Sequence, residues 1–139
     1  MIRLKYKVNI KDTQSYLDMY NKPCKCIWCK NYLKTFTSIY PEAVELLNKL
    51  GVRVEYPLEI IDCFWNDRED KRCYESYYSI KGELFEDKTV IYDKDVVITL
   101  YQSDTDEPIY SNTGMEKPYF ILKIANIELP WVLDKIPED

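Results

Sequence analysis

The apolar positions at the start of the chain are every second residue: Ile2, Leu4, Tyr6, Val8 and Ile10. A period of two is typical of a half-buried strand, so residues 2–10 are predicted to form the first strand. Asp12 is a suitable N-cap for a short helix after it, and Pro23 is expected to end that helix.

The period changes to that of a helix from Trp28 onward. Apolar side chains recur on one helix face in two successive runs, from Trp28 to Ile39 and from Val44 to Leu50. Pro41 suits the first turn of the second helix, and Gly51 suits its C-terminal cap. The two runs therefore predict a helical hairpin.

Beyond Gly51 the spacing is again that of strands, predicted at residues 52–56, 58–65, 73–84, 96–101 and 119–127. The polar runs 66–72 and 103–108 are expected to be exposed loops. The apolar tail from Leu129 to Leu133 is expected to pack back on the core. Short polar loops favour antiparallel pairing, so the predicted class is α+β, an antiparallel β-sheet with an N-terminal helical hairpin packed on one side.

The composition agrees with one folded domain over residues 1–139. Hydrophobic residues make up 46% of the chain and charged residues 31%, which is the balance of an ordinary globular domain. There are 13 tyrosines but only 3 glycines. Because aromatic side chains favour pleated, half-buried surfaces, sheet is expected to dominate.

The charge is unevenly distributed. Residues 1–40 carry eight lysines and arginines against two aspartates, yet the whole chain has a net charge of −5. The remainder is therefore strongly acidic, which suits either contact with a charged partner or complementary parts of one fold. The start of the chain lacks the apolar run of a signal peptide, and no segment is apolar enough to span a membrane, so a cytoplasmic location is expected.

Cysteine is the residue type that most suggests chemistry, because the chain has no histidine. The five cysteines are Cys24, Cys26, Cys29, Cys63 and Cys73. Cys26 and Cys29 have the spacing of half a zinc site, and Cys24 could add a third thiolate from the same loop. The fourth ligand would be Cys63 or Cys73, which a hairpin centred near Arg68 places opposite each other.

Other uses of these thiols remain open. Cys26 and Cys29 precede or begin a helix, where the helix dipole favours a thiolate, so they could form a redox pair. An iron–sulfur centre is a further alternative. Cysteine is also a small, commonly buried residue, so the thiols could simply pack in the interior without metal.

No other catalytic motif is found. The sequence has no phosphate-binding glycine loop and no metalloprotease motif, and it cannot have a histidine base. Lysines interleave with Trp28, Tyr32 and Phe36, as in single-strand nucleic-acid binders. These aromatic residues have core-facing spacing and the chain is acidic, so nucleic acid is not the expected partner. Several tyrosines on the predicted strands could instead form a protein-binding face.

Four segments together resemble a family of small uncharacterised bacterial proteins without an assigned activity. They are Cys24-Lys25-Cys26-Ile27-Trp28-Cys29-Lys30-Asn31-Tyr32, Leu46-Leu47-Asn48-Lys49-Leu50-Gly51-Val52, Tyr77-Tyr78-Ser79-Ile80-Lys81-Gly82 and Leu129-Pro130-Trp131-Val132-Leu133. The resemblance spans most of the chain. It implies a histidine at the position that Ser79 occupies here, so a metal site using that histidine would not be shared.

The expected function is that of a small bacterial protein-binding module rather than an enzyme. Its cysteine loop would be stabilised by packing or by zinc, and its acidic face would contact another protein. The enzyme alternative is a thiol-dependent redox protein that uses Cys26 and Cys29. A third hypothesis is an acidic, immunity-type protein that neutralises a basic toxin or nuclease.

Overall fold

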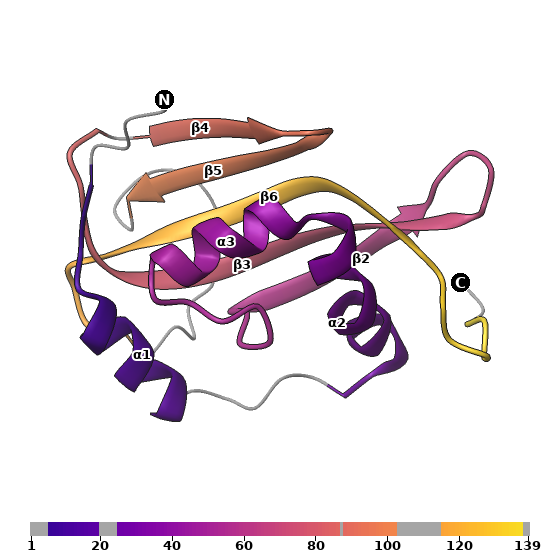
Figure 1. Cartoon of the computed structure of the whole chain (residues 1–139), viewed down its shortest axis with the longest axis horizontal. Coiled ribbons are helices and arrows are strands. Elements are labelled where there is room, and N and C mark those ends of the chain that lie inside the picture. Colours follow the sequence, from indigo (N-terminus) through magenta and orange to yellow (C-terminus); the bar gives the residue numbers. More distant parts are fainter. Residues whose placement is uncertain (1–5, 20–24, 87, 103–114, 138–139) are drawn as a thin grey trace.

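The computed structural model of the chain describes residues 6–19, 25–86, 88–102 and 115–137. Its elements are β1 (Tyr6–Val8), α1 (Ile10–Met19), α2 (Ile27–Ile39), α3 (Pro41–Lys49), β2 (Glu59–Trp65), β3 (Lys71–Leu84), β4 (Lys88–Asp93), β5 (Val96–Gln102) and β6 (Tyr119–Pro130). Figure 1 shows them as helices beside one long, curled sheet. Within the described ranges, no helix has the length and apolarity needed to cross a membrane.

All strand pairs in the sheet are antiparallel, with the order β1-β3-β6-β5-β4. The 14-residue strand β3 pairs with three other strands, β1, β2 and β6. It pairs along most of its length with β6, whereas β2 and β1 share its other edge, β2 near its start and β1 at its end. The predicted α+β class with an antiparallel sheet is therefore confirmed.

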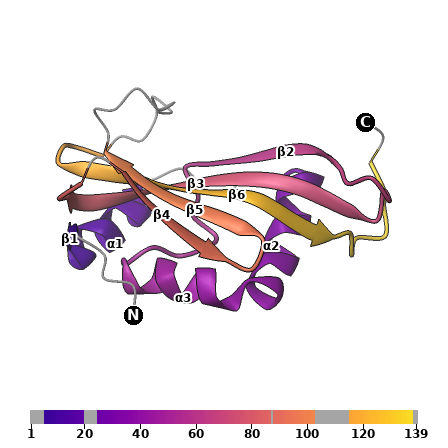
Figure 2. The ribbon, with the colours of Figure 1, turned by 90° about the horizontal axis from the view of Figure 1, so that it is seen from above.

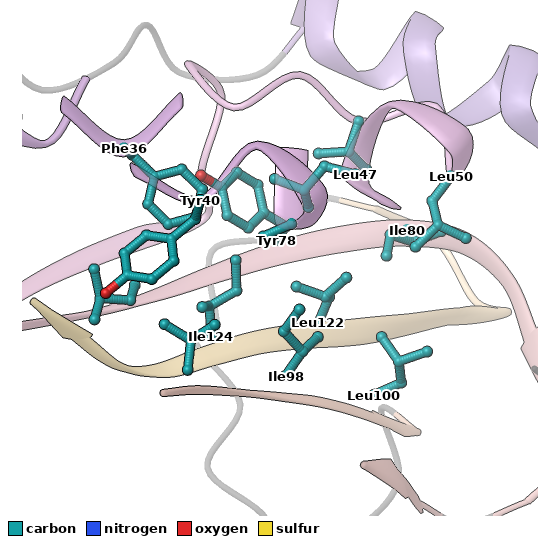
Figure 3. Close-up of a cluster of buried hydrophobic side chains, with 14 of the residues drawn as sticks. Phe36, Tyr40, Leu47, Leu50, Tyr78, Ile80, Ile98, Leu100, Leu122 and Ile124 are labelled. Carbon is teal, nitrogen blue, oxygen red and sulfur yellow. The ribbon is translucent and has the colours of Figure 1, made fainter. Parts of the chain in front are cut away.

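The three helices lie on one face of the sheet, as Figure 2 shows from above. Alternate residues of β3, β5 and β6 point toward this face, because side chains alternate along a strand. Together with α2 and α3 they form the main core, whose central side chains appear in Figure 3: Phe36, Tyr40, Leu47, Leu50, Tyr78, Ile80, Ile98, Leu100, Leu122 and Ile124. A smaller buried cluster of Leu58, Tyr77, Tyr101 and Ile121 lies on the opposite face.

The predicted first strand is too long at its C-terminal end. Strand β1 covers only Tyr6–Val8 within the described residues, and Ile10 begins α1. The reason is Asn9, whose side-chain oxygen accepts a hydrogen bond from the Asp12 amide at 2.9 Å. Its backbone oxygen accepts another from the Thr13 amide at 3.0 Å. Asn9 rather than Asp12 therefore caps the helix.

The bounds of helices α2 and α3 are close to those predicted. Helix α2 begins after Cys26, and Gly51 follows α3 with a φ of +85°, as a C-terminal cap requires. The predicted helical hairpin is not confirmed. Only Tyr40 separates α2 from α3, whereas helical hairpins usually have loops of about two to five residues.

One strand prediction is wrong, and one strand was not predicted. Residues 52–56 form turns, with a hydrogen bond from the Tyr56 amide to the Arg53 carbonyl, although Val52 is buried and Val54 packs on the core. Conversely, β4 was not predicted from the sequence. It forms a hairpin with β5 around Lys94, which has a φ of +54°. The loop predicted at 103–108 lies outside the described residues.

Candidate functional site

The first two described cysteines lie at the start of α2. Cys26 is exposed and caps the helix, since its Sγ accepts a hydrogen bond from the Cys29 amide at 3.4 Å. Cys29 is buried one turn further on. Cys24 lies outside the described residues. The structure therefore places the two candidate redox thiols three residues apart along the helix start, one facing solvent and one facing the interior.

Cys63 and Cys73 lie on the neighbouring strands β2 and β3. The register pairs Cys73 with Phe64, and the strands shift register between Asp62 and Phe64, so Cys63 is the extra residue of a β-bulge. Both thiols line a cleft of about 380 Å³. The prediction that a hairpin places these two cysteines roughly opposite each other is confirmed to within one residue, since the register partner of Cys73 is Phe64.

The two cysteine pairs lie on opposite faces of the sheet. The residue after Cys73, Tyr74, belongs to the helix-side core and donates a hydrogen bond to the Trp28 carbonyl of α2 at 2.8 Å. Because strand side chains alternate, Cys73 points to the other face. Among the described residues, no three His, Cys, Asp or Glu side chains are grouped so as to hold a metal. Zinc binding therefore stays a prediction, because Cys24, one of its predicted ligands, lies outside the described residues.

The surroundings of Cys63 and Cys73 keep both thiols protonated at neutral pH. Burial raises the pKa of Cys63, and the nearby Glu75 carboxylate and Cys73 raise it further. Burial also raises the pKa of Cys73, with Glu128 adding to the effect and Arg72 opposing it. Thiols of this kind react slowly with electrophiles, because the thiolate is the nucleophile.

Arg72 is a buried charged residue, although its sequence position suggested an exposed loop. Its side chain is only 2% exposed and forms an ion pair with Asp62 at 3.0 Å. The guanidinium lies 4.1 Å from the ring centre of Trp28 and 5.2 Å from that of Trp65. Stacking on aromatic faces is a favourable environment for a desolvated guanidinium.

Trp131 completes an aromatic cluster around this arginine. Its ring centre is 5.5 Å from that of Trp28 and 5.6 Å from that of Trp65. Asn31 of α2 holds the same segment, accepting a hydrogen bond from the Val132 amide and donating one to the Pro130 carbonyl. The apolar tail therefore packs back on the fold, as predicted. An aromatic cage can bind an external cation, but this one is filled by the protein's own Arg72.

Carboxylates gather at the end of the molecule formed by the β4–β5 turn and the start of α3. Glu42 and Glu45 come from α3, and Asp93 and Asp95 flank the turn. A hydrogen bond with Asp93 raises the pKa of Glu42, and the charges of Asp93 and Glu45 raise it further, with Lys94 opposing. Asp93, Asp95 and Glu128 also raise the pKa of buried Tyr40, after burial itself. We call these five carboxylates the acidic end.

Replacing Glu42 with glutamine is expected to stabilise the protein at neutral pH. The folded pKa of Glu42 lies above its unfolded value, so its contribution to stability is present at low pH and is lost as the pH rises through the folded pKa. Glutamine cannot ionise and can still donate to Asp93. Thermal unfolding should give a higher Tm for Glu42→Gln at pH 7, with the gap closing toward pH 4.

Glu45→Gln is the matched control, since Glu45 lies one turn away and affects Glu42 only through its charge. Its gain at pH 7 should be smaller. A gap for Glu42→Gln that stays constant between pH 4 and pH 7 would contradict the proposed pairing with Asp93.

Exposed apolar side chains lie beside the acidic end, on edge strand β4. Tyr92 is 72% exposed and Val90 is 41% exposed, and both point away from the helices. Tyr74, Tyr77, Tyr78 and Tyr101, by contrast, are buried. The tyrosine-rich strands thus serve mainly as core, and Tyr92 is the exposed exception among these five residues.

Comparisons with known proteins do not assign the chain to a family. No family model, no curated protein and no solved structure matches the chain. Sequence reasoning missed Arg72 as a buried residue, whereas Tyr92 was among the tyrosines predicted as a possible protein-binding face. The signal for Arg72 was its place directly before the alternating strand.

Proposed function

We propose that this chain is a protein-binding module, rather than an enzyme, and that it contacts a partner with a basic surface. The observation that supports the proposal is the acidic end, in which Glu42, Glu45, Asp93, Asp95 and Glu128 lie near one another, with Lys94 as a nearby cation. Charged patches of one sign steer an oppositely charged partner and select against wrong ones.

The energetics of this region favour a role in binding. A like charge that raises the pKa of a carboxyl group reduces folding stability at neutral pH, and Asp93 acts in this way on Glu42. A basic partner would relieve that repulsion on binding. Tyr92 and Val90 supply apolar contact area on the edge strand that ends at Asp93, on the face away from α3, and an exposed tyrosine is a frequent source of binding energy in interfaces.

The test compares two surface variants of the full chain. Tyr92→Lys should abolish capture of a partner from a lysate of the source cells, because it removes the aromatic contact and adds a repelling charge. Ile136→Lys is the matched control, since Ile136 is exposed on the C-terminal segment. The captured partner should be basic and should dissociate as salt is raised. Equal capture by Tyr92→Lys and wild type, or capture of acidic proteins, would refute the proposal.

The neutralising role is the second candidate, and the acidic end supports it as well. A protein that masks a toxin or nuclease must match the basic surface with which such enzymes hold nucleic acid. Under this narrower proposal, the captured partner is a basic nuclease or toxin whose activity stops when this chain is added. A basic partner with unaltered activity would favour the general binding role instead.

A further inference from the structure

Cys63 and Cys73 form a pair that the proposed binding function does not use. They lie on the sheet face away from the helices, and both are free thiols with partial exposure. The proposed binding function uses charge and Tyr92 but not the thiols, although Asp95 and Glu128 of the acidic end line the same cleft as the two cysteines.

The local backbone brings the two residues together. At the β-bulge, Cys63 and Phe64 of β2 both oppose Cys73 of β3. Facing residues on paired antiparallel strands have Cα atoms about 4.5–5.5 Å apart. Disulfides require Cα separations of about 4.4–6.8 Å. The register partner of Cys73 is Phe64, and Cys63 is the adjacent residue of the bulge, so a small backbone movement suffices to bring the two sulfurs together.

The thiols are also reachable from solvent. They line the same cleft of about 380 Å³, whose wall includes the side chains of Glu75 and Glu128. A thiol pair in a cleft of this size can meet a small disulfide, whereas buried Cys29 cannot. Partial exposure of both cysteines, which line one cleft, distinguishes this pair from Cys26 and Cys29, of which only Cys26 is exposed.

We propose that Cys63 and Cys73 are a reversible redox site that closes to an intramolecular disulfide by exchange with a low-molecular-weight disulfide such as oxidised glutathione. One cysteine, as thiolate, attacks a sulfur of the glutathione disulfide, forming a mixed disulfide and releasing one glutathione thiolate, which takes up the proton. The second cysteine, as thiolate, attacks the protein-bound sulfur and releases the second glutathione. The protein loses two hydrogens, and one oxidised glutathione becomes two reduced molecules.

The disulfide would fix the β-bulge between the Arg72–Asp62 ion pair and the aromatic cluster. Asp62, which holds Arg72, precedes Cys63, and Trp65 of the aromatic cluster follows Phe64. Strand β2 is hydrogen-bonded to β3 within the sheet, so a covalent link would tie it to β3 independently of those hydrogen bonds. The oxidised protein is therefore expected to have a higher Tm than the reduced protein.

The experiment equilibrates the reduced full chain with glutathione buffers of increasing oxidation for several hours, then quenches and alkylates the free thiols. Peptide mapping should show Cys63 joined to Cys73, with the loss of two free thiols per chain, and dithiothreitol should restore both. Cys63→Ser and Cys73→Ser should each stop at a stable glutathione adduct on the remaining cysteine.

The double variant Cys26→Ser/Cys29→Ser is the control and should form the same disulfide as the wild type. Mapping of the wild-type chain needs no variant to fold, so the test is decisive on its own. The proposal is overturned if the two cysteines stay reduced under fully oxidising buffer, carry separate glutathione adducts, or pair with other cysteines.

Discussion

Replacing Arg72 with alanine is expected to lower the free energy of unfolding by about 3 kcal/mol, as for removal of one partner from a buried ion pair. The variant leaves Asp62 without its cation and leaves a gap between Trp28 and Trp65. Asp62 is 35% exposed, so water will replace part of the lost interaction and hold the cost at this level. Urea unfolding followed by far-UV circular dichroism measures the change.

Arg53 offers a matched control for this prediction. It also pairs with a carboxylate, Glu55 at 2.8 Å, and also lies over an aromatic ring, that of Tyr56 at 5.4 Å. Its side chain is 64% exposed, so Arg53→Ala should cost less than about 1 kcal/mol. Similar losses for the two variants would show that burial of Arg72 does not determine its contribution.

Replacing Gly82 with alanine is expected to cost about 2–4 kcal/mol and to release β1 from the sheet. Gly82 has a φ of +153°, which side chains strongly disfavour. An added Cβ would lie 2.1 Å from the Lys7 carbonyl oxygen and 2.9 Å from the Val8 Cα, both backbone atoms of β1. Strand β1 must move away to accommodate it.

Hydrogen exchange can detect the release of β1 from the sheet. The Asn9 amide donates to the Lys81 carbonyl at 2.8 Å, and this hydrogen bond should lose its protection in Gly82→Ala. Glu83→Ala is the control, since Glu83 is the exposed neighbour of Gly82 and also pairs with β1; it should change stability by less than about 0.5 kcal/mol. Retained protection at Asn9 would contradict a clash with β1.

The sequence predicted those elements whose periodicity and end signals agree. Helix α2 has an apolar stripe through Tyr32 and Phe36, both fully buried, and α3 has Pro41 at its start and Gly51 after its end. The long alternating strand β3 was also predicted to within two residues. In each case local propensity and the tertiary structure favour the same backbone, so the pattern suffices.

The failures come from residues whose local pattern and tertiary environment differ. Arg72 looks like part of a polar loop, but stacking on Trp28 outweighs its preference for water. Val52 and Val54 alternate like a strand, yet both pack on the core from a turn. Strand β4 is recognised by its pairing with β5, and the spacing of apolar residues along the chain does not predict that pairing.

The same division applies to the candidate sites. Opposition of Cys63 and Cys73 followed from counting residues around a hairpin, a local inference. That this pair lies on the other sheet face from Cys29 could not be predicted by counting residues. It depends on which sheet face α2 covers, and this is decided by the whole set of buried side chains.

The aromatic cluster has a practical consequence for spectroscopy. Trp28, Trp65 and Trp131 are the 3 tryptophans of the chain, so all tryptophan emission comes from one site around Arg72. The indole signal should therefore report events at the β2–β3 end and the C-terminal segment while leaving the β4–β5 turn unseen. Tyr92, at the proposed interface, can be observed through tyrosine-specific labelling instead. The protein thus contains a built-in local probe, and its fluorescence should not be treated as an average over the fold.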